Sequence, residues 1–223
     1  MARNIHEDAV LVVGLGRFGS ALADVLERVG HDVLAVDDNG ERVQEWSGRL
    51  THVVEADATS EAAMRQLGAQ EFKIAVVAIG TEIEASLLSA AVLIDIGVRE
   101  VWAKAITPAH GKILERIGVN HVVFPERDAG SRVAHLITGV LIDFIEFDDG
   151  FAIAKMCAPR EAWSRTLADS RFRSKYGVTI VGVKRPGEDF TYAQADTKVH
   201  EGDLLIVSGR TELVERFAAE TRA

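Results

Sequence analysis

The glycine-rich segment Val10-Leu-Val-Val-Gly-Leu-Gly-Arg-Phe-Gly19 constrains this chain more than any other feature. Gly14, Gly16 and Gly19 have the G-x-G-x-x-G spacing, after an apolar run and before a helical pattern. There, the first glycine permits a tight turn, the second lets phosphate approach the backbone, and the third lets the helix pack on the strand. The segment predicts a Rossmann domain that binds an adenine nucleotide or dinucleotide. The alternative is a turn that is glycine-rich by chance.

Short apolar runs alternate with amphipathic helical patterns through the first 150 residues. The predicted strands are 9–13, 33–36, 51–54, 74–79, 100–103 and 121–124. The predicted helices include 18–29, 61–67, 84–96 and 108–117, and glycines that we interpret as helix ends follow at Gly30, Gly40, Gly68, Gly97 and Gly118. This alternation predicts an α/β fold with a doubly wound parallel sheet, covered by helices on both faces.

The charge changes along the chain. Residues 1–149 carry a net charge of -11 and residues 150–223 a net charge of +2, within a total of -9. We therefore predict two domains, 1–149 and 150–223. The second reads as a smaller α+β module, with strands at 152–157, 178–184, 190–193 and 204–208 and a helix at 211–219.

Composition excludes several classes of protein. No apolar run reaches the length of about 18 residues needed for a membrane span, and we expect no signal peptide at the N-terminus. The single cysteine, Cys157, cannot form an internal disulfide. These features favour a cytoplasmic protein. An acidic chain does not attract nucleic acid, and its histidines lack the spacing of a zinc site or catalytic triad.

Charged side chains near the predicted strand ends are candidate ligands of the nucleotide. Asp37 ends the second strand, where a carboxylate can accept hydrogen bonds from ribose hydroxyls; a helix cap is the alternative. Arg17 lies inside the glycine loop beside Phe18, and suits exposed terminal phosphates or else faces solvent. Lys104 ends the fifth strand, where it can reach phosphate. Glu126 follows the sixth strand, where it either binds a divalent cation or simply favours a first helical turn.

Two further strand ends complete the candidate site. Asp57-Ala-Thr59 follows the third strand, where Asp57 approaches adenine or ribose, or Asp57, Thr59 or Ser60 caps a helix. Ile79 and Gly80 end the fourth strand with room for a nucleotide to lie close.

A wide apolar stripe at helical spacing follows Glu126 and runs from Ala129 to Ile145. It predicts one long helix that crosses to a second subunit, unless it packs on its own sheet. In the second module, Arg171, Arg173, Lys175, Lys184 and Arg185 form a basic cluster that either binds an anion or is a solvated surface.

Taken together, these motifs resemble the regulatory subunits of bacterial potassium uptake systems of the KtrA/TrkA type. In that family an N-domain of the "regulator of K+ conductance" (RCK) type precedes an RCK C-domain. The matching segments are 12–19, 30–37, 77–80, 102–105, 117–118, 125–130, 175–180 and 202–204. The segment Ala56-Asp-Ala-Thr59 lacks a glycine common in the family.

The resemblance implies a non-enzymatic sensor that gates a membrane K+-translocating subunit of the KtrB/TrkH type, at the inner face of the cell membrane. It implies homodimers assembled into an octameric ring, activated by ATP and inactivated by ADP. Arg17 matches an arginine that contacts the γ-phosphate across the dimer, Glu126 matches an acidic residue that helps hold Mg2+ or Ca2+, and Asp37 matches the ribose ligand.

The resemblance also implies a second ligand, cyclic di-AMP, in the C-domain. Leu167, Ala168, Arg173 and Lys175 match its contacts, but Arg185-Pro186 replaces the relatives' histidine pair. The main alternative function is an NAD(H)-dependent oxidoreductase, which needs a catalytic acid or base that the sequence does not show. A Rossmann-type transcriptional repressor is a third candidate, and it would need a DNA-binding segment before Val10.

Overall fold

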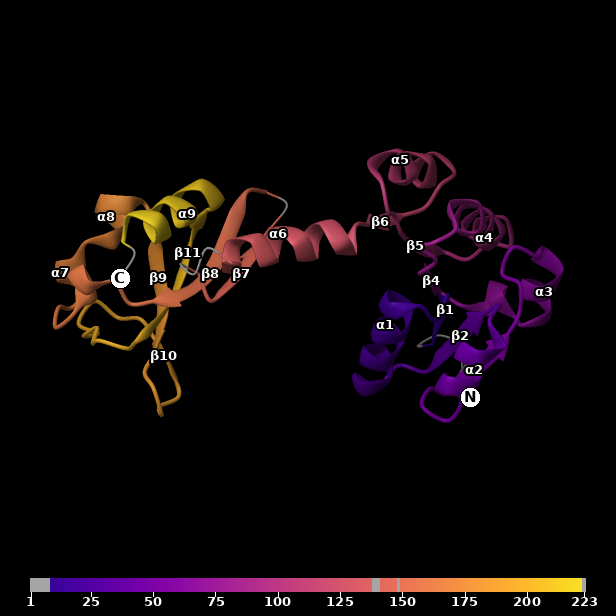
Figure 1. Cartoon of the computed structure of the whole chain (residues 1–223), viewed down its shortest axis with the longest axis horizontal. Coiled ribbons are helices and arrows are strands. Elements are labelled where there is room, and N and C mark those ends of the chain that lie inside the picture. The colour runs from indigo at the N-terminus through magenta and orange to yellow at the C-terminus, as the bar shows by residue number, and fades with distance from the viewer. Residues whose placement is uncertain (1–8, 138–140, 148, 222–223) are drawn as a thin grey trace, which may run out of the picture. The chain divides into compact units, whose positions relative to one another are not determined.

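A computed structural model describes residues 9–137, 141–147 and 149–221. The chain divides into two compact units, Met1–Glu126 and Arg127–Ala223, and each is described by itself. Figure 1 labels their helices and strands. The expected division after residue 149 thus lies within the second unit.

The first unit is built on a six-stranded parallel sheet of order β3-β2-β1-β4-β5-β6. The strands are β1 (Val10–Val13), β2 (Val33–Asp37), β3 (His52–Glu55), β4 (Ile74–Val77), β5 (Glu100–Lys104) and β6 (His121–Val123). Every residue of β1 and β2 is buried, as expected for central strands with both faces covered. This order confirms the predicted doubly wound fold, whose switch point lies between β1 and β4.

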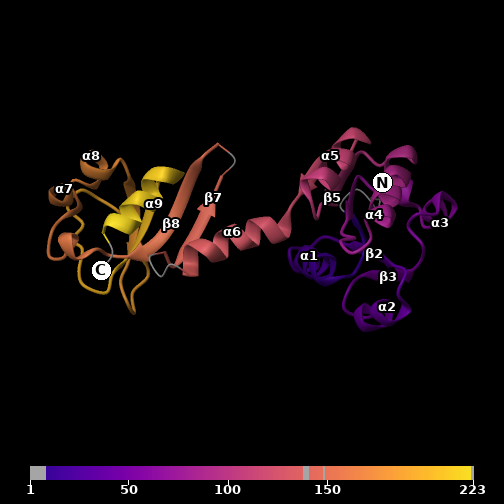
Figure 2. The same ribbon diagram turned by 45° about the horizontal axis from the view of Figure 1, so that its top comes forward.

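Helices cover both faces of this sheet. They are α1 (Arg17–Arg28), α2 (Gly40–Trp46), α3 (Glu61–Gln66), α4 (Ile83–Asp95) and α5 (Pro108–Arg116), with a 3-10 turn, η1 (Ala69–Glu71). Leu11 and Val13 belong to one core with helical residues such as Leu93, while Val12 belongs to another core with Ala23 of α1. Figures 1 and 2 show α4 and α5 on one side of the sheet and α1 and α2 on the other.

Four of the five predicted helix-ending glycines have positive φ, as such an ending requires: Gly30, Gly68, Gly97 and Gly118. The fifth prediction is wrong, because Gly40 is the first residue of α2. Asn39 caps that helix, its side-chain oxygen accepting from the backbone N–H groups of Glu41 at 3.0 Å and Arg42 at 3.1 Å. Sequence analysis missed α2 because the helix is short and has no buried residue that would mark a periodic face.

The second unit contains a five-stranded sheet of order β10-β9-β11-β8-β7, antiparallel throughout. Its strands are β7 (Asp143–Glu146), β8 (Phe151–Cys157), β9 (Thr179–Lys184), β10 (Phe190–Tyr192) and β11 (Leu204–Arg210). Its other elements are α6 (Pro125–Ile137), which begins at the division between the units, η2 (Arg160–Ala162), α7 (Leu167–Ser170), α8 (Phe172–Tyr176) and α9 (Thr211–Glu220). The fully buried ring of Phe217 on α9 packs against the rings of Phe172 and Tyr176.

The prediction of one helix continuing to Ile145 is wrong. Within the described residues α6 ends at Ile137, and Asp143–Glu146 is strand β7, paired with β8 through Phe144 and Ala154. Phe144 is buried in the second core. A short apolar run fits both helical and strand periodicity, and the pairing with the next strand, β8, decides between them. Val140, part of the predicted stripe, lies outside the described residues.

None of the residues in α6 is buried, and Ile137 is 79% exposed. The part of the stripe within α6 is therefore not buried by its own unit, whereas Leu141 and Phe144, further along the stripe, belong to the core of the second unit. The dimer stays a prediction. Within the described residues, no helix has the length and apolar character needed to cross a membrane.

The glycine loop gives a test of the fold. A Cβ at Gly19 would lie 1.8 Å from the Gly14 carbonyl oxygen and 2.8 Å from the Ala78 Cβ, whereas a Cβ at Gly16 would meet nothing within 4 Å. We expect Gly19→Ala to lower the free energy of unfolding by about 2 kcal/mol or more, because backbone atoms would have to move. The matched control, Gly16→Ala, should change it by less than about 0.5 kcal/mol. Urea unfolding of the two variants checks this, and equal stabilities would refute the packing described.

Candidate functional site

A pocket of about 510 Å³ lies at the carboxyl ends of the parallel strands. Ligands bind at this edge of doubly wound sheets. The pocket brings together nearly all of the predicted nucleotide-site residues: Gly14, Gly16, Arg17, Phe18, Asp37, Asp57, Ala58, Thr59, Ile79, Gly80, Lys104 and Glu126. Gly19 does not line it but packs against Gly14 behind the loop.

The glycine loop forms one wall of the pocket. Gly14 has a φ of +97°, and its N–H donates to the Val36 carbonyl at 2.7 Å, which fixes the turn after β1. The loop ends in α1, whose first residue is Arg17 and whose N-cap residue Gly16 supplies no side-chain cap. The N–H groups at the start of α1 thus have no side chain competing with an anion for them.

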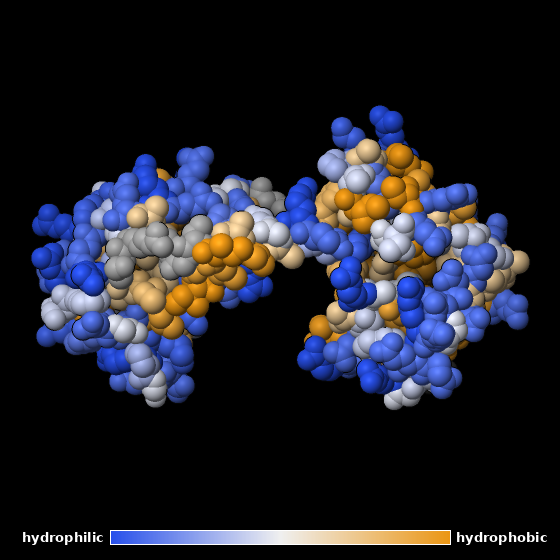
Figure 3. Space-filling view, viewed as in Figure 1, coloured by the Kyte–Doolittle hydropathy of each residue, from blue (hydrophilic) through white to orange (hydrophobic). Residues whose placement is uncertain are grey.

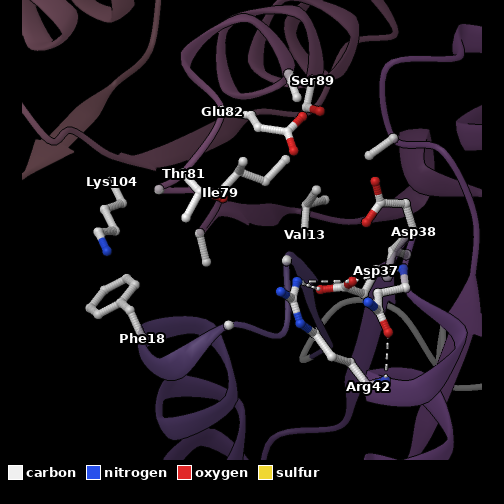
Figure 4. A pocket seen from close by; sticks show the side chains of 18 of the residues that line it. Val13, Phe18, Asp37, Asp38, Arg42, Ile79, Thr81, Glu82, Ser89 and Lys104 are labelled. Atoms are coloured by element: carbon white, nitrogen blue, oxygen red, sulfur yellow. Dashed lines mark hydrogen bonds and ion pairs between the residues drawn. The ribbon is translucent and has the colours of Figure 1, made fainter.

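Asp37 is the most deeply buried charged side chain of the pocket, at 4% exposure. Its Oδ2 accepts from the N–H of Leu15 at 2.6 Å, and its Oδ1 accepts from the N–H of Asn39 at 2.9 Å. Arg42 Nη1 lies 3.4 Å from both carboxylate oxygens (Figure 4). Asp37 therefore has a structural role, because it joins the glycine loop to the end of β2.

Arg42 is a pocket residue that sequence analysis missed. It lies five residues after Asp37 on α2, so one turn of that helix places its guanidinium beside the carboxylate. The cap residue Asn39 was the available signal, because an Asn before a charged stretch commonly starts a helix.

Lys104 and Glu126 meet at the other end of the pocket. Lys104 Nζ lies 2.6 Å from Glu126 Oε1, and the lysine side chain is 10% exposed whereas that of Glu126 is 65% exposed. The same Nζ lies 5.7 Å above the centre of the Phe18 ring. A Cβ at Gly80 would lie 2.8 Å from Nζ, so this glycine leaves the lysine its space.

The hydrogen bond from Lys104 lowers the pKa of Glu126, against a smaller opposing effect of burial. The charges of Lys104 and Arg17 lower the pKa of Glu126 further. Glu126 is therefore a carboxylate at neutral pH and can accept from Lys104 or bind a cation. The described residues include no cluster of three or more His, Cys, Asp or Glu side chains suited to a metal ion.

Asp57 forms a local turn at the end of β3. Its Oδ1 accepts from the N–H of Thr59 at 2.9 Å and from the Thr59 hydroxyl at 2.7 Å, and these bonds lower the pKa of Asp57. Ser60, rather than Asp57 or Thr59, caps α3, since its hydroxyl accepts from the N–H of Ala63. Asp57 thus remains at the pocket wall without serving as the helix cap.

The predicted cyclic di-AMP residues lie in the second unit and are held by their own neighbours. Arg173 donates to the Thr179 hydroxyl from Nε at 3.2 Å and from Nη2 at 3.0 Å. Lys175 pairs with Glu161, which also accepts from the Tyr176 hydroxyl at 2.6 Å. The backbone N–H groups of Leu167 and Ala168 donate to the carbonyls of residues 197 and 195. Cyclic di-AMP binding stays a prediction of the resemblance.

The Lys104–Glu126 pair predicts the direction in which the pKa of Glu126 changes when Lys104 is replaced. Lys104→Met removes the hydrogen bond that lowers the pKa of Glu126, so that pKa should rise toward its ordinary value of 4.5. An NMR titration of the Glu126 carboxyl carbon in both proteins measures this change. Arg17→Ala should raise the pKa less, because Arg17 acts only through its charge and contributes least.

The same pair makes stability depend on pH. Because the pKa of Glu126 is lower in the folded chain than in the unfolded chain, the pair stabilises the fold above about pH 4.5 and loses this effect as the pH falls through the lowered pKa. The difference in stability between wild type and K104M should therefore shrink on acidification. A pKa that is unchanged in K104M would contradict this assignment.

Comparisons with known proteins agree with this architecture. The chain matches the TrkA-N domain over residues 10–125 and the TrkA-C domain over residues 163–221. It is 35% identical to the Ktr system potassium uptake protein A of Bacillus subtilis, covering 94% of this chain and 95% of that protein. It is 34% identical to the protein of the same name from Vibrio alginolyticus, covering 89% and 90%.

Solved structures share the fold at lower identity. The GsuK RCK domain matches with a TM-score of 0.67 and 18% identity, over 97% of this chain and 48% of that one. The GsuK channel described as bound to NAD matches with a TM-score of 0.63 and 19% identity, over 93% and 38%. The paired domain matches and the near full-length identity show that this chain belongs to the TrkA-N/TrkA-C family that includes the Ktr system potassium uptake proteins.

Proposed function

We propose that this chain is a regulatory subunit that binds ATP and ADP in the pocket of its first unit and thereby gates a membrane K+-translocating subunit. The observation that carries the proposal is the arrangement of charges along the pocket. Figure 4 shows Asp37 and Lys104 at opposite ends of the pocket. Glu126 pairs with Lys104, and the charge of Arg17, in the glycine loop, acts on Glu126. Relatives named as potassium uptake proteins, and GsuK structures described as bound to NAD and to ADP, support this ligand class and role.

Each part of the pocket has a separate task in this proposal. Asp37 accepts from the ribose hydroxyls, and the N–H groups at the start of α1 bind the diphosphate. Arg17 and Lys104 supply positive charge where a third phosphate would lie. ATP and ADP differ only in that phosphate, so only contacts made there favour one state of the protein over another. A coupling of about 1–3 kcal/mol is ordinary for such switches.

Glu126 gives ATP a further distinguishing contact. A divalent cation on the terminal phosphates would take oxygen ligands from those phosphates, from water and from Glu126. The hydrogen bond from Lys104 would then pass from Glu126 to phosphate, since both are anionic acceptors within reach of one buried ammonium group. Mg2+ and Ca2+ both fit this oxygen-rich ligand set.

Assembly and location follow from the same proposal. Homodimers would assemble into an octameric ring that lies at the inner face of the cell membrane, bound to the K+-translocating subunit. The exposed apolar side chains of α6, including Val133 and Ile137, suit burial against a second copy.

Arg17 gives the sharpest test of phosphate sensing. We expect Arg17→Ala to weaken ATP binding at least about tenfold and ADP binding much less, because the charged contact is to the terminal phosphate. Calorimetric titration with Mg2+ present measures both affinities. Arg28→Ala is the matched control, since Arg28 is at the far end of α1, pairs with Asp24 and does not line the pocket. An equal loss for both nucleotides would exclude this role for Arg17.

The gating role is tested with the complete transport system. The chain is purified with its K+-translocating subunit and reconstituted in vesicles, and K+ flux is measured with ATP, ADP, NADH or cyclic di-AMP. We expect ATP to raise the flux, ADP to lower it, and R17A to remove most of this difference. Light scattering of the chain alone should give a mass near eight copies. The oxidoreductase alternative would be favoured by two results together. K+ flux would not change with ATP or ADP, and NADH alone would raise the thermal stability of the chain.

A further inference from the structure

Four buried side-chain polar atoms in the described part of the chain lack a hydrogen-bond partner: Ser86 Oγ, Ser89 Oγ, His110 Nε2 and Thr211 Oγ1. A buried hydroxyl without a partner is costly, and in natural proteins it calls for an explanation such as a ligand. Of these four residues, only Ser89 also lines the pocket. Ser89 is therefore the residue that both lines the pocket and carries one of these unpartnered atoms.

Helical geometry explains why Ser89 and not Ser86 reaches the pocket. Ala85 and Ser89 are four residues apart on α4, so they lie one turn apart on the same face, and both line the pocket. Ser86 is one position further round the helix and does not line it. Ala85 has only a methyl side chain and so leaves space beside Ser89.

The position of Ser89 indicates which part of a nucleotide would meet it. In Figure 4 Ser89 lies apart from Lys104 and Phe18 and apart from Asp37 and Arg42. The remaining wall of the pocket includes the apolar side chains of Val13, Ala58 and Ile79. With the phosphates and the ribose assigned to the other ends, the base is left for this apolar part.

The burial of Ser89 also favours a contact with the base. The residue is 0% exposed, so water does not supply the missing partner of its hydroxyl. The edge of a flat ring held between apolar walls is the group that suits such a position. The adenine ring nitrogens are acceptors, and a serine hydroxyl donates to them.

We propose that Ser89 is a nucleobase-binding residue whose hydroxyl donates to a ring nitrogen of adenine. This rests on the adenine nucleotide function proposed above. It assigns recognition of the base to α4, a helix that carries none of the residues selected from the sequence. Because the contact involves the base alone, it strengthens ATP and ADP binding by the same factor.

The first test is Ser89→Ala, with Ser86→Ala as the matched control. Both variants remove a buried, unpartnered hydroxyl from the same helix, so neither should lower the thermal unfolding temperature of the free protein. S89A should weaken the binding of ATP and of ADP alike, by about three- to tenfold. S86A should leave both affinities unchanged, because Ser86 does not line the pocket.

The second test identifies the atom on the base. Binding of 1-deaza-, 3-deaza- and 7-deaza-ADP, each lacking one ring nitrogen, is measured for wild type and S89A. We expect one analogue to bind wild type about as weakly as ADP binds S89A, and to lose nothing more in S89A. The other two analogues should still lose the full factor in S89A.

The outcomes separate this inference from the function on which it rests. If wild type binds neither ATP nor ADP, the proposed function fails and the role of Ser89 fails with it. If wild type binds both but S89A binds them as tightly, or S86A loses as much as S89A, only the role of Ser89 is refuted. A loss in S89A that is confined to ATP, or that is the same for ADP and all three analogues, would also refute a base contact.

Discussion

The hydrogen bond from the Leu15 N–H to the buried carboxylate of Asp37 holds together the edge of the sheet on which the site depends. It joins the loop after β1 to the end of β2, and the bond from Gly14 to Val36 runs beside it. Gly19 then allows α1 to pack against the Gly14 carbonyl, where a Cβ would not fit. The start of α1, the glycine loop and the end of β2, where the proposed function places the ribose, are thus linked by hydrogen bonds and packing, which limits the conformational freedom lost on binding.

The two ends of the pocket differ in this respect. Asp37 is fixed by backbone N–H groups on both of its oxygens. Lys104 is instead a buried ammonium group whose anionic partner, Glu126, is 65% exposed. In the proposed function, phosphate replaces Glu126 as the acceptor of the Lys104 hydrogen bond, so the buried ammonium group keeps an anionic partner. The rigid end suits binding common to all adenine nucleotides, and the exchangeable end suits discrimination between them.

Much of the first unit could be predicted from the sequence because its determinants are local. The strand order follows from alternating apolar runs and right-handed crossovers, and strand ends place Asp37, Lys104 and Glu126 at one edge. What was missed depends on contacts that periodicity does not reveal. Strand β7 is fixed by its pairing with the following strand, β8. Arg42 was missed together with α2, the short helix that places it beside Asp37. Ser89 gave no signal, because a serine within an apolar helix reads as packing until its lack of a partner is seen.

Separating the contacts shared by ATP and ADP from the contacts to the terminal phosphate affects what the protein senses. In the proposed function, contacts to base and ribose would add equally to ATP and ADP binding, so they would set how much of the protein is occupied without shifting its state. Contacts at Arg17, Lys104 and Glu126 would then determine which state the bound nucleotide favours. If the common contacts keep the site filled at cellular nucleotide concentrations, the protein responds to the ratio of ATP to ADP rather than to their sum. The proposed base contact at Ser89 and the proposed phosphate contacts at Lys104 and Glu126 would let one pocket separate total nucleotide concentration from the ratio of ATP to ADP.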